Sequence, residues 1–211
     1  MAFERGALIV LEGCDRAGKS TQVKMLVRAL NDRLIRAEAM SFPDRTTAIG
    51  STINQYLLNK TELEPGAIHL LFSKNRWERA SDMIESLNSG KTLIIDRYAA
   101  SGAAYAAANT GEDLESCKKP DIGLPRPDLV AFLHIEEEKQ NLRGGWGEER
   151  FEKQEMQRKV ADNFEKLKED NWEVIDAEQD VEEVHKQLME AVLKVIERVK
   201  HTSIQELYKK D

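Results

Sequence analysis

Short apolar runs alternate with longer amphipathic segments along the chain. Five runs have the length and apolar content of buried strands: Leu8–Leu11, Ala37–Phe42, Thr92–Ile95, Leu129–Ile135 and Trp172–Ile175. Between them, apolar residues recur every three or four positions, which predicts helices near 19–34, 46–59, 65–88, 101–108, 152–169 and 181–199. Strands that alternate with helices predict an α/β fold, in which a five-stranded parallel sheet carries helices on both faces.

The apolar stripes of these helices belong to the core. The last helix carries the longest stripe, formed by Val181, Val184, Leu188, Val192, Val195 and Val199. The first helix carries Val23, Leu26, Val27, Leu30 and Leu34. The chain has 211 residues, no internal repeat and no linker rich in proline or serine. These features predict a single domain over residues 1–211.

The sequence between the first strand and the first helix has the spacing of a phosphate-binding loop. Residues 13–21 read Gly-Cys-Asp-Arg-Ala-Gly-Lys-Ser-Thr, which matches the pattern Gly-x4-Gly-Lys-Ser. In such a loop, backbone N–H groups and a helix N-terminus surround an anion, a lysine adds an ammonium group, and a hydroxyl binds magnesium. This setting predicts a P-loop NTPase fold that binds a nucleoside triphosphate and Mg²⁺.

Ligands of open parallel sheets bind where the strands end at their carboxyl edge. The third predicted strand leads into Asp96 and Arg97, and the second into Phe42 and Arg45. Asp96 takes the position of a Walker-B-type carboxylate, so we expect it to hold Mg²⁺ together with Ser20. The two arginines can each bind a pair of phosphate oxygens. A helix cap for Asp96 and surface ion pairs for the arginines are the alternatives.

Charge and cysteine content narrow the setting of the protein. The formal net charge is -7 and the basic residues are dispersed, so we expect no nucleic-acid partner. The chain shows no signal peptide and no apolar segment of membrane-spanning length, so we expect no membrane association. Cys14 and Cys117 lack metal-ligand spacing and suit a reducing compartment, which predicts the cytoplasm, with the nucleus as a second compartment. Cys14 is either a thiol of lowered pKa at the helix N-terminus or a small filler.

Five motifs follow one another along the chain: the loop at 13–21, Phe42-Pro43-x-Arg45, His69-Leu70-Leu71-Phe72-Ser73-x-Asn75-Arg76-Trp77, Asp96-Arg97-Tyr98 and Gly123-Leu124-Pro125-x-Pro127-Asp128. Each alone is weak. Together they resemble the thymidylate kinase family of eukaryotic type, within the superfamily of P-loop nucleoside monophosphate kinases. The resemblance extends from about Arg5 to the end of the helix predicted at 181–199.

The resemblance implies transfer of the γ-phosphoryl group of ATP to deoxythymidine monophosphate (dTMP), giving dTDP and ADP, a magnesium-dependent step of dTTP biosynthesis. It implies an ATP site formed by Gly13, Asp15, Arg16, Ala17, Gly18, Lys19, Ser20, Thr21 and Arg143, with Arg143 against adenine. It assigns catalysis to Arg16, Lys19, Asp96 and Arg97, and magnesium to Ser20 and Asp96. Arg16 would stabilise the negative charge on the transferred group from within the loop.

The resemblance also implies a dTMP site formed by Asp15, Phe42, Arg45, Phe72, Arg76, Arg97, Ser101, Gly102, Tyr105, Phe151 and Gln157. Phe72 would stack on thymine and Arg76 would hydrogen-bond its edge. Arg45 and Arg97 would hold the acceptor phosphate, and Asp15 would meet the sugar 3′-hydroxyl. Two residues depart from the family pattern: Phe151 stands where tyrosine is common, and Tyr105 where vertebrate-type members have phenylalanine.

The segment at about 141–152 would be the lid that closes over ATP and excludes water. Gly144, Gly145 and Gly147 give it hinge freedom. No general base is required, because the second pKa of a phosphate monoester is about 6 and an ionised oxygen is present at neutral pH. Family members are usually homodimers, so we expect a homodimer.

Three other functions share parts of this pattern. A deoxynucleoside kinase would need a general base, for which Glu12 is the candidate, and fewer arginines at the acceptor phosphate. A GTP-dependent switch would read guanine through Asn-Lys-x-Asp, which Asn59-Lys60-Thr61-Glu62 imitates with a different last residue and no preceding strand. A non-catalytic nucleotide-binding protein would not need Lys19, Ser20 and Asp96 together. The preferred acceptor and donor distinguish these functions.

Overall fold

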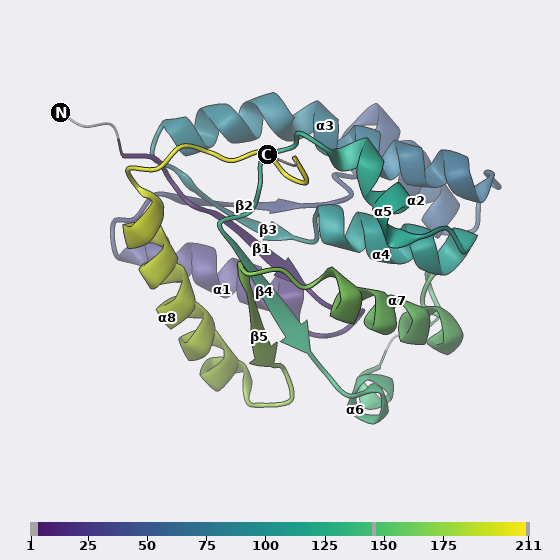
Figure 1. Ribbon diagram of the computed structural model, residues 1–211. Coiled ribbons are helices and arrows are strands. Elements are labelled where there is room, and N and C mark those ends of the chain that lie inside the picture. The colour runs from purple at the N-terminus through teal and green to yellow at the C-terminus, as the bar shows by residue number, and fades with distance from the viewer. Residues whose placement is uncertain (1–3, 145–146, 210–211) are drawn as a thin grey trace.

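The computed structural model describes residues 4–144 and 147–209, which form a parallel sheet between layers of helices (Figure 1). The strands are β1 (Leu8–Glu12), β2 (Ala37–Ser41), β3 (Thr92–Asp96), β4 (Leu129–His134) and β5 (Trp172–Asp176). They lie in the order β2-β3-β1-β4-β5, and every pairing is parallel. The predicted α/β fold with a five-stranded parallel sheet is confirmed.

The helices of the described residues are α1 (Lys19–Asp32), α2 (Ala48–Leu57), α3 (Pro65–Asn88), α4 (Ala99–Thr110), α5 (Leu114–Lys118), α6 (Glu137–Leu142), α7 (Gln154–Leu167) and α8 (Val181–Val199), with a 3₁₀ turn η1 (Lys119–Asp121). α3 and α8 have the predicted bounds, and α1, α2, α4 and α7 differ by two residues at one or both ends. α5 and η1 were not predicted, because elements of five and three residues are too short to show a helical repeat.

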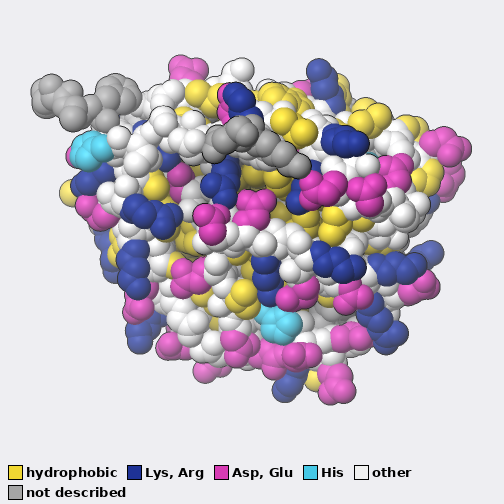
Figure 2. Space-filling view, viewed as in Figure 1, with side chains coloured by type: hydrophobic (Ala, Val, Ile, Leu, Met, Phe, Trp, Pro, Cys, Tyr) yellow, Lys and Arg dark blue, Asp and Glu magenta, His cyan; other side chains and the backbone are white. Residues whose placement is uncertain are grey.

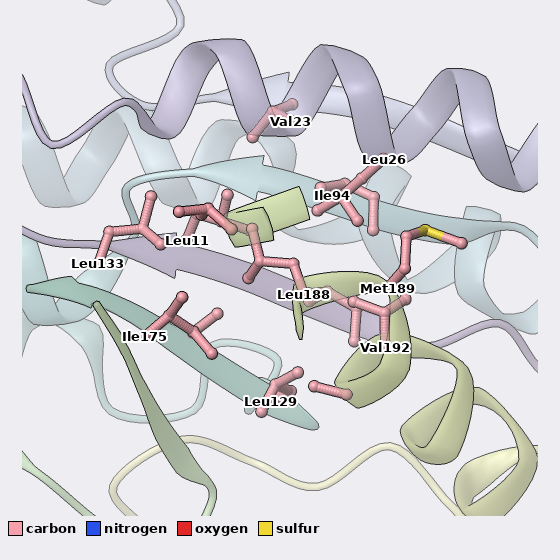
Figure 3. Close-up of a cluster of buried hydrophobic side chains, with 14 of the residues drawn as sticks. Leu11, Val23, Leu26, Ile94, Leu129, Leu133, Ile175, Leu188, Met189 and Val192 are labelled. Atoms are coloured by element: carbon pink, nitrogen blue, oxygen red, sulfur yellow. The ribbon is translucent and has the colours of Figure 1, made fainter. Parts of the chain in front are cut away.

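β1 lies in the middle of the sheet, and its residues alternate between two cores. Ile9 and Leu11 pack with α1 and α8, and part of this cluster is drawn in Figure 3. Leu8 and Val10 pack on the other face with α3 and with the chain beyond α8. Helices therefore cover both faces of the sheet, as the buried apolar strands predict.

Two residues of the predicted stripes lie outside the core. Leu34 is 93% exposed and has a positive φ of 64°, because α1 ends at Asp32 and the chain turns before reaching it. Val181 is 52% exposed and is the first residue of α8. Periodicity identified both helices but not where their packing surfaces end.

The register of the sheet brings three strand ends to one edge. Leu11 of β1 and Ser41 of β2 both pair with Asp96 of β3. The P-loop, Phe42 and Arg97 therefore leave the sheet side by side. This edge positions the candidate site.

The surface carries both signs of charge. On the face in Figure 2, Lys and Arg side chains are interspersed with Asp and Glu. Within residues 4–144 and 147–209, no helix has both the length and the apolar character of a membrane-spanning segment.

Candidate active site

A cavity of about 510 Å³ opens at the carboxyl edge of the sheet. Most of the expected site residues form its wall: Asp15, Arg16, Gly18, Lys19, Ser20, Thr21, Phe42, Arg45, Phe72, Arg76, Asp96, Arg97, Ser101, Gly102, Tyr105 and Phe151. Four expected residues do not line it, namely Gly13, Ala17, Arg143 and Gln157. The fold thus brings residues from four of the five motifs into one space, while the motif at 123–128 does not line the cavity.

Glycine at two positions allows the P-loop to fold. Gly13 has a φ of 141°, and a Cβ there would lie 2.6 Å from the carbonyl oxygen of Leu133. Gly18 has a φ of 96° and forms the N-cap of α1 without a side-chain hydrogen bond. The N-cap residue therefore supplies no side-chain acceptor to the first N–H groups of α1, which is the arrangement that suits a phosphate.

Lys19 lies inside the loop that it follows. Its Nζ donates hydrogen bonds to the carbonyl oxygens of Gly13 at 3.1 Å and Cys14 at 2.7 Å. Burial, together with the positive charge of Arg97, lowers the pKa of Lys19 to about 8. The negative charge of a bound triphosphate would favour the ammonium form and raise this pKa again.

Ser20 and Asp96 meet at the cavity wall, where the serine hydroxyl donates a hydrogen bond to the carboxylate. Both groups are hard oxygen ligands. Mg²⁺ takes one or two protein oxygens and completes its octahedron with water and substrate phosphates. This donor pair beside Lys19 therefore fits Mg²⁺.

Arg97 joins the P-loop to α4. It forms an ion pair with Asp15 and donates hydrogen bonds at 3.2 Å to the carbonyl oxygen of Gly13 and the hydroxyl of Ser101. Asp15 also accepts a hydrogen bond from Nε2 of Gln157 at 2.7 Å. Gln157 is buried beside Asp15 and outside the cavity wall, so in this structure it orients Asp15 and does not face the cavity.

Glu12, the candidate base of a deoxynucleoside kinase, is engaged in hydrogen bonds to residues at the start of α4. One carboxylate oxygen accepts the N–H groups of Tyr98 and Ser101 at 2.9 and 3.0 Å, and the other accepts the Ser101 hydroxyl at 2.5 Å. Burial raises the pKa of this carboxyl. Glu12 is fully engaged at the start of α4 and does not line the cavity.

Aromatic rings form another part of the wall: Phe42, Phe72, Tyr98, Tyr105 and Phe151. The ring centres of Tyr105 and Phe151 lie 5.8 Å apart, and those of Phe42 and Tyr98 lie 5.6 Å apart. Flat apolar surfaces of this kind suit a planar ring ligand.

Arg76 is held rigidly beside these rings. Its Nη2 and Nε donate to the two oxygens of Asp121 at 2.7 and 3.1 Å, and the side chains of the pair are only 4% and 1% exposed. Gly102 provides the room, because a Cβ there would lie 2.5 Å from Nη2. Asp121 was not predicted from the sequence, because it lies in the irregular segment before β4 and carries no motif of its own.

Two lid carboxylates that the sequence analysis missed also line the cavity. Glu149 pairs with Arg45 at 2.7 Å, and Glu152 pairs with Arg16 at 3.3 Å. The second oxygen of Glu152 accepts the N–H groups of residues 147–149 at 2.8 to 3.1 Å. Because several acidic residues adjoin them in the sequence, no spacing rule distinguishes these two.

Arg143 contacts the P-loop, whereas two glycines of the lid have open space around them. Arg143 donates to the carbonyl oxygens of Arg16 at 2.6 Å and Ala177 at 2.7 Å. Among the described residues other than their chain neighbours, no atom lies within 4 Å of a Cβ built on Gly144 or Gly147, so a side chain has room at either position. Gly145 lies outside the described residues.

The structure bears on two further hypotheses from the sequence, which concern the Cys14 thiol and the Asn59–Glu62 segment. Burial raises the pKa of the Cys14 thiol to about 11, so Cys14 is a buried filler and the alternative of a lowered pKa is wrong. The Asn59–Glu62 segment follows a helix, and its Thr61 carbonyl and Glu62 carboxylate accept hydrogen bonds from Arg150 at 3.3 and 2.7 Å. This segment anchors the lid and does not line the cavity.

The site combines a P-loop, with its lysine and serine, and a strand-end aspartate at the edge of a parallel sheet. Further arginines and aromatic rings face these groups. Together these features define a P-loop phosphotransferase. The family model for thymidylate kinase matches residues 11–188 of the chain. The chain therefore belongs to the thymidylate kinase family.

Individual relatives agree with the family model. The chain is 47% identical to thymidylate kinase of Danio rerio, over 99% of this chain and 100% of the relative. It is 47% identical to the human thymidylate kinase over 89% of this chain and 90% of that protein. The solved structure of thymidylate kinase from Candida albicans superposes with a TM-score of 0.84 at 37% identity and covers 96% of this chain and 98% of that chain.

Proposed function

We propose that this chain transfers the γ-phosphoryl group of ATP to dTMP and so produces ADP and dTDP, the reaction of its family. One observation carries the proposal: a single cavity wall holds both the P-loop residues and the arginines and rings of an acceptor site. Donor and acceptor can therefore lie in contact, as an in-line transfer requires.

At the donor side, the N–H groups at the start of α1 and the ammonium of Lys19 bind the β- and γ-phosphates. Ser20 and Asp96 hold Mg²⁺, which supplies charge neutralisation on the phosphates when bound. Arg143 lies against adenine. Its hydrogen bond to the Arg16 carbonyl oxygen of the P-loop supports this role.

At the acceptor side, Arg45 and Arg97 hold the phosphate of dTMP, and Phe72 stacks on thymine. Arg76 donates to the base edge from the position that Asp121 gives it. Asp15 accepts the sugar 3′-hydroxyl, supported by Gln157. A phosphate acceptor explains why arginines line this region and why Glu12 is not required as a base.

Arg16 stabilises the charge on the phosphoryl group in flight. Its ion pair with Glu152 ties it to the lid, so lid closure and arginine position are linked. Correctly placed arginines in related phosphoryl transfer contribute on the order of a thousandfold or more.

The lid is the segment at about 141–152, within a single domain over 1–211. Arg150 attaches it to α2 through hydrogen bonds to the Leu57 and Tyr56 carbonyl oxygens at 2.8 and 3.1 Å. Phe151 packs into the apolar cluster of α2. One sheet and one lid predict a single cooperative unfolding transition, measured by calorimetry, and two separate transitions would contradict this division.

The chain also forms a homodimer, through α3. Leu70, Trp77 and Ile84 are exposed at intervals of seven residues and so lie on one face of α3. Trp77 contacts the turn at Pro120, which also carries the exposed Ile122. A second copy would cover this apolar face. Sedimentation should give a dimer for the unaltered chain and a monomer for Leu70→Lys with Ile84→Lys; a dimer in both would contradict this interface.

The cytoplasm, with the nucleus as a second compartment, is the proposed location. Cys14 and Cys117 are both free thiols, which suits a reducing compartment. A fluorescent fusion located in a secretory compartment would contradict this proposal.

The activity is tested by following ADP release from ATP and Mg²⁺ with dTMP, dUMP, dGMP and thymidine as rival acceptors. The proposal predicts the highest kcat/KM with dTMP. Preference for thymidine would favour a deoxynucleoside kinase, and equal rates with all four acceptors would contradict the dTMP site.

A further inference from the structure

The chain beyond α8 folds back across the molecule. In Figure 1 it runs from the end of α8 toward α3 and the segment that precedes β4. We call residues 203–209 the strap. Its backbone pairs with that segment: the N–H groups of Gly123 and Arg126 donate to the carbonyl oxygens of Leu207 and Gln205 at 3.0 and 2.8 Å, and Leu207 donates to Leu124 at 2.7 Å.

The strap also closes the core behind the acceptor side of the cavity. Leu207 is 5% exposed and packs in one cluster with Leu124, Phe42 and Tyr98. Phe42 and Tyr98 line the cavity, whereas no described strap residue does. The Leu207 side chain therefore reaches the site only through its neighbours.

The segment that the strap holds contains Asp121. From the other side, the Ser73 hydroxyl and the Trp77 indole of α3 donate to the Pro120 carbonyl at 3.1 and 2.8 Å. Asp121 thus lies in a turn fixed by α3 on one flank and by the strap on the other. Its carboxylate sets the guanidinium of Arg76.

We infer that the strap is a positioning element for the acceptor nucleotide, acting through the 119–126 segment and Asp121 on Arg76. The inference rests on the proposed function, in which Arg76 binds thymine. Since Arg76 faces the acceptor and the strap does not line the cavity, loosening the strap should weaken dTMP binding and leave ATP binding unchanged.

The test substitutes Leu207→Ala and compares it with Leu188→Ala, which removes a buried leucine from the other core, between α8 and the opposite face of the sheet. We expect Leu207→Ala to raise KM for dTMP about three- to tenfold with little change in KM for ATP, and Leu188→Ala to change neither. Leu207→Val is the milder variant if Leu207→Ala does not fold. Equal dTMP KM values in the Leu207 and Leu188 variants would overturn the inference.

A double-mutant cycle shows whether the strap acts through Asp121. Asp121→Asn should raise KM for dTMP by itself, and adding Leu207→Ala should add much less than its separate effect. If the effects of the two substitutions on KM for dTMP were fully additive, the inference about the strap would be overturned while the proposed function would stand. No turnover of dTMP by the unaltered chain would overturn the proposed function, and the inference with it.

Discussion

Substituting Gly102→Ala tests whether the position of Arg76 determines acceptor binding. The new Cβ would lie 2.5 Å from Nη2 and 2.9 Å from Cζ of Arg76. Favourable contacts between such atoms begin near 3.5 Å, so the guanidinium must move by roughly 1 Å. An arginine often moves easily, but this one is fixed by two hydrogen bonds to a buried aspartate.

The size of the effect follows from the contact that is lost. A hydrogen bond from a charged donor contributes about 1.5–3 kcal/mol, which corresponds to a roughly 10- to 100-fold loss of kcat/KM for dTMP. The affinity for ATP should stay within about twofold, because the three atoms nearest the new Cβ all belong to Arg76 and none to the P-loop.

Steady-state kinetics with each substrate varied in turn measures both values. Gly66→Ala is the matched control, since a Cβ on this helical glycine meets no described atom within 4 Å outside its own helix turn. It should leave both KM values unchanged. If Gly102→Ala bound dTMP as well as the unaltered chain does, either Arg76 would not contact the base or its position would not matter, and the reasoning would be refuted.

Three further predictions concern single residues. Arg97→Ala should lower turnover of dTMP by at least about 100-fold while ATP affinity, measured by calorimetry, stays within about threefold; loss of ATP binding would show that Arg97 serves the donor. Because the pKa of Lys19 is about 8 in the free protein and ATP binds the ammonium form, ATP affinity should be constant below pH 8 and fall about tenfold per pH unit above it; constant affinity up to pH 9.5 would contradict this. Burial lowers the pKa of His69 from 6.5 to about 4, so the folded protein favours the neutral imidazole. The stabilisation that follows from this shift is fully present above pH 6.5 and is lost as the pH falls toward 4. His69→Gln should remove that pH dependence, which is worth at most about 3 kcal/mol in the free energy of unfolding by urea. If the free energy of unfolding of the variant changed with pH as it does in the unaltered chain, this would count against a buried neutral imidazole.

The sequence predicted the parts of the fold that repeat locally. The strands and the bounds of α3 and α8 follow from apolar spacing that persists over the whole element. The end of α1 does not, because the apolar stripe continues to Leu34 while the backbone turns before it. The strand order was not predicted either, since it depends on pairings between distant segments.

In the candidate site too, local features could be predicted from the sequence, whereas contacts between distant residues could not. The P-loop is contiguous, so its spacing is visible in the sequence. The pairs Arg76–Asp121, Arg16–Glu152 and Asp15–Gln157 join residues 45, 136 and 142 positions apart. No local pattern relates such partners, and only the fold shows that Asp121, Glu152 and Gln157 position residues that face the cavity.

The most direct test of the account follows the phosphoryl group itself. ATP labelled in its γ-phosphate is incubated with the chain, Mg²⁺ and dTMP, and the labelled products are separated. If the phosphoryl group passes directly between two substrates in one cavity, the amount of labelled dTDP should equal the amount of ADP formed. Label released as inorganic phosphate, or ADP formed without dTDP, would contradict it.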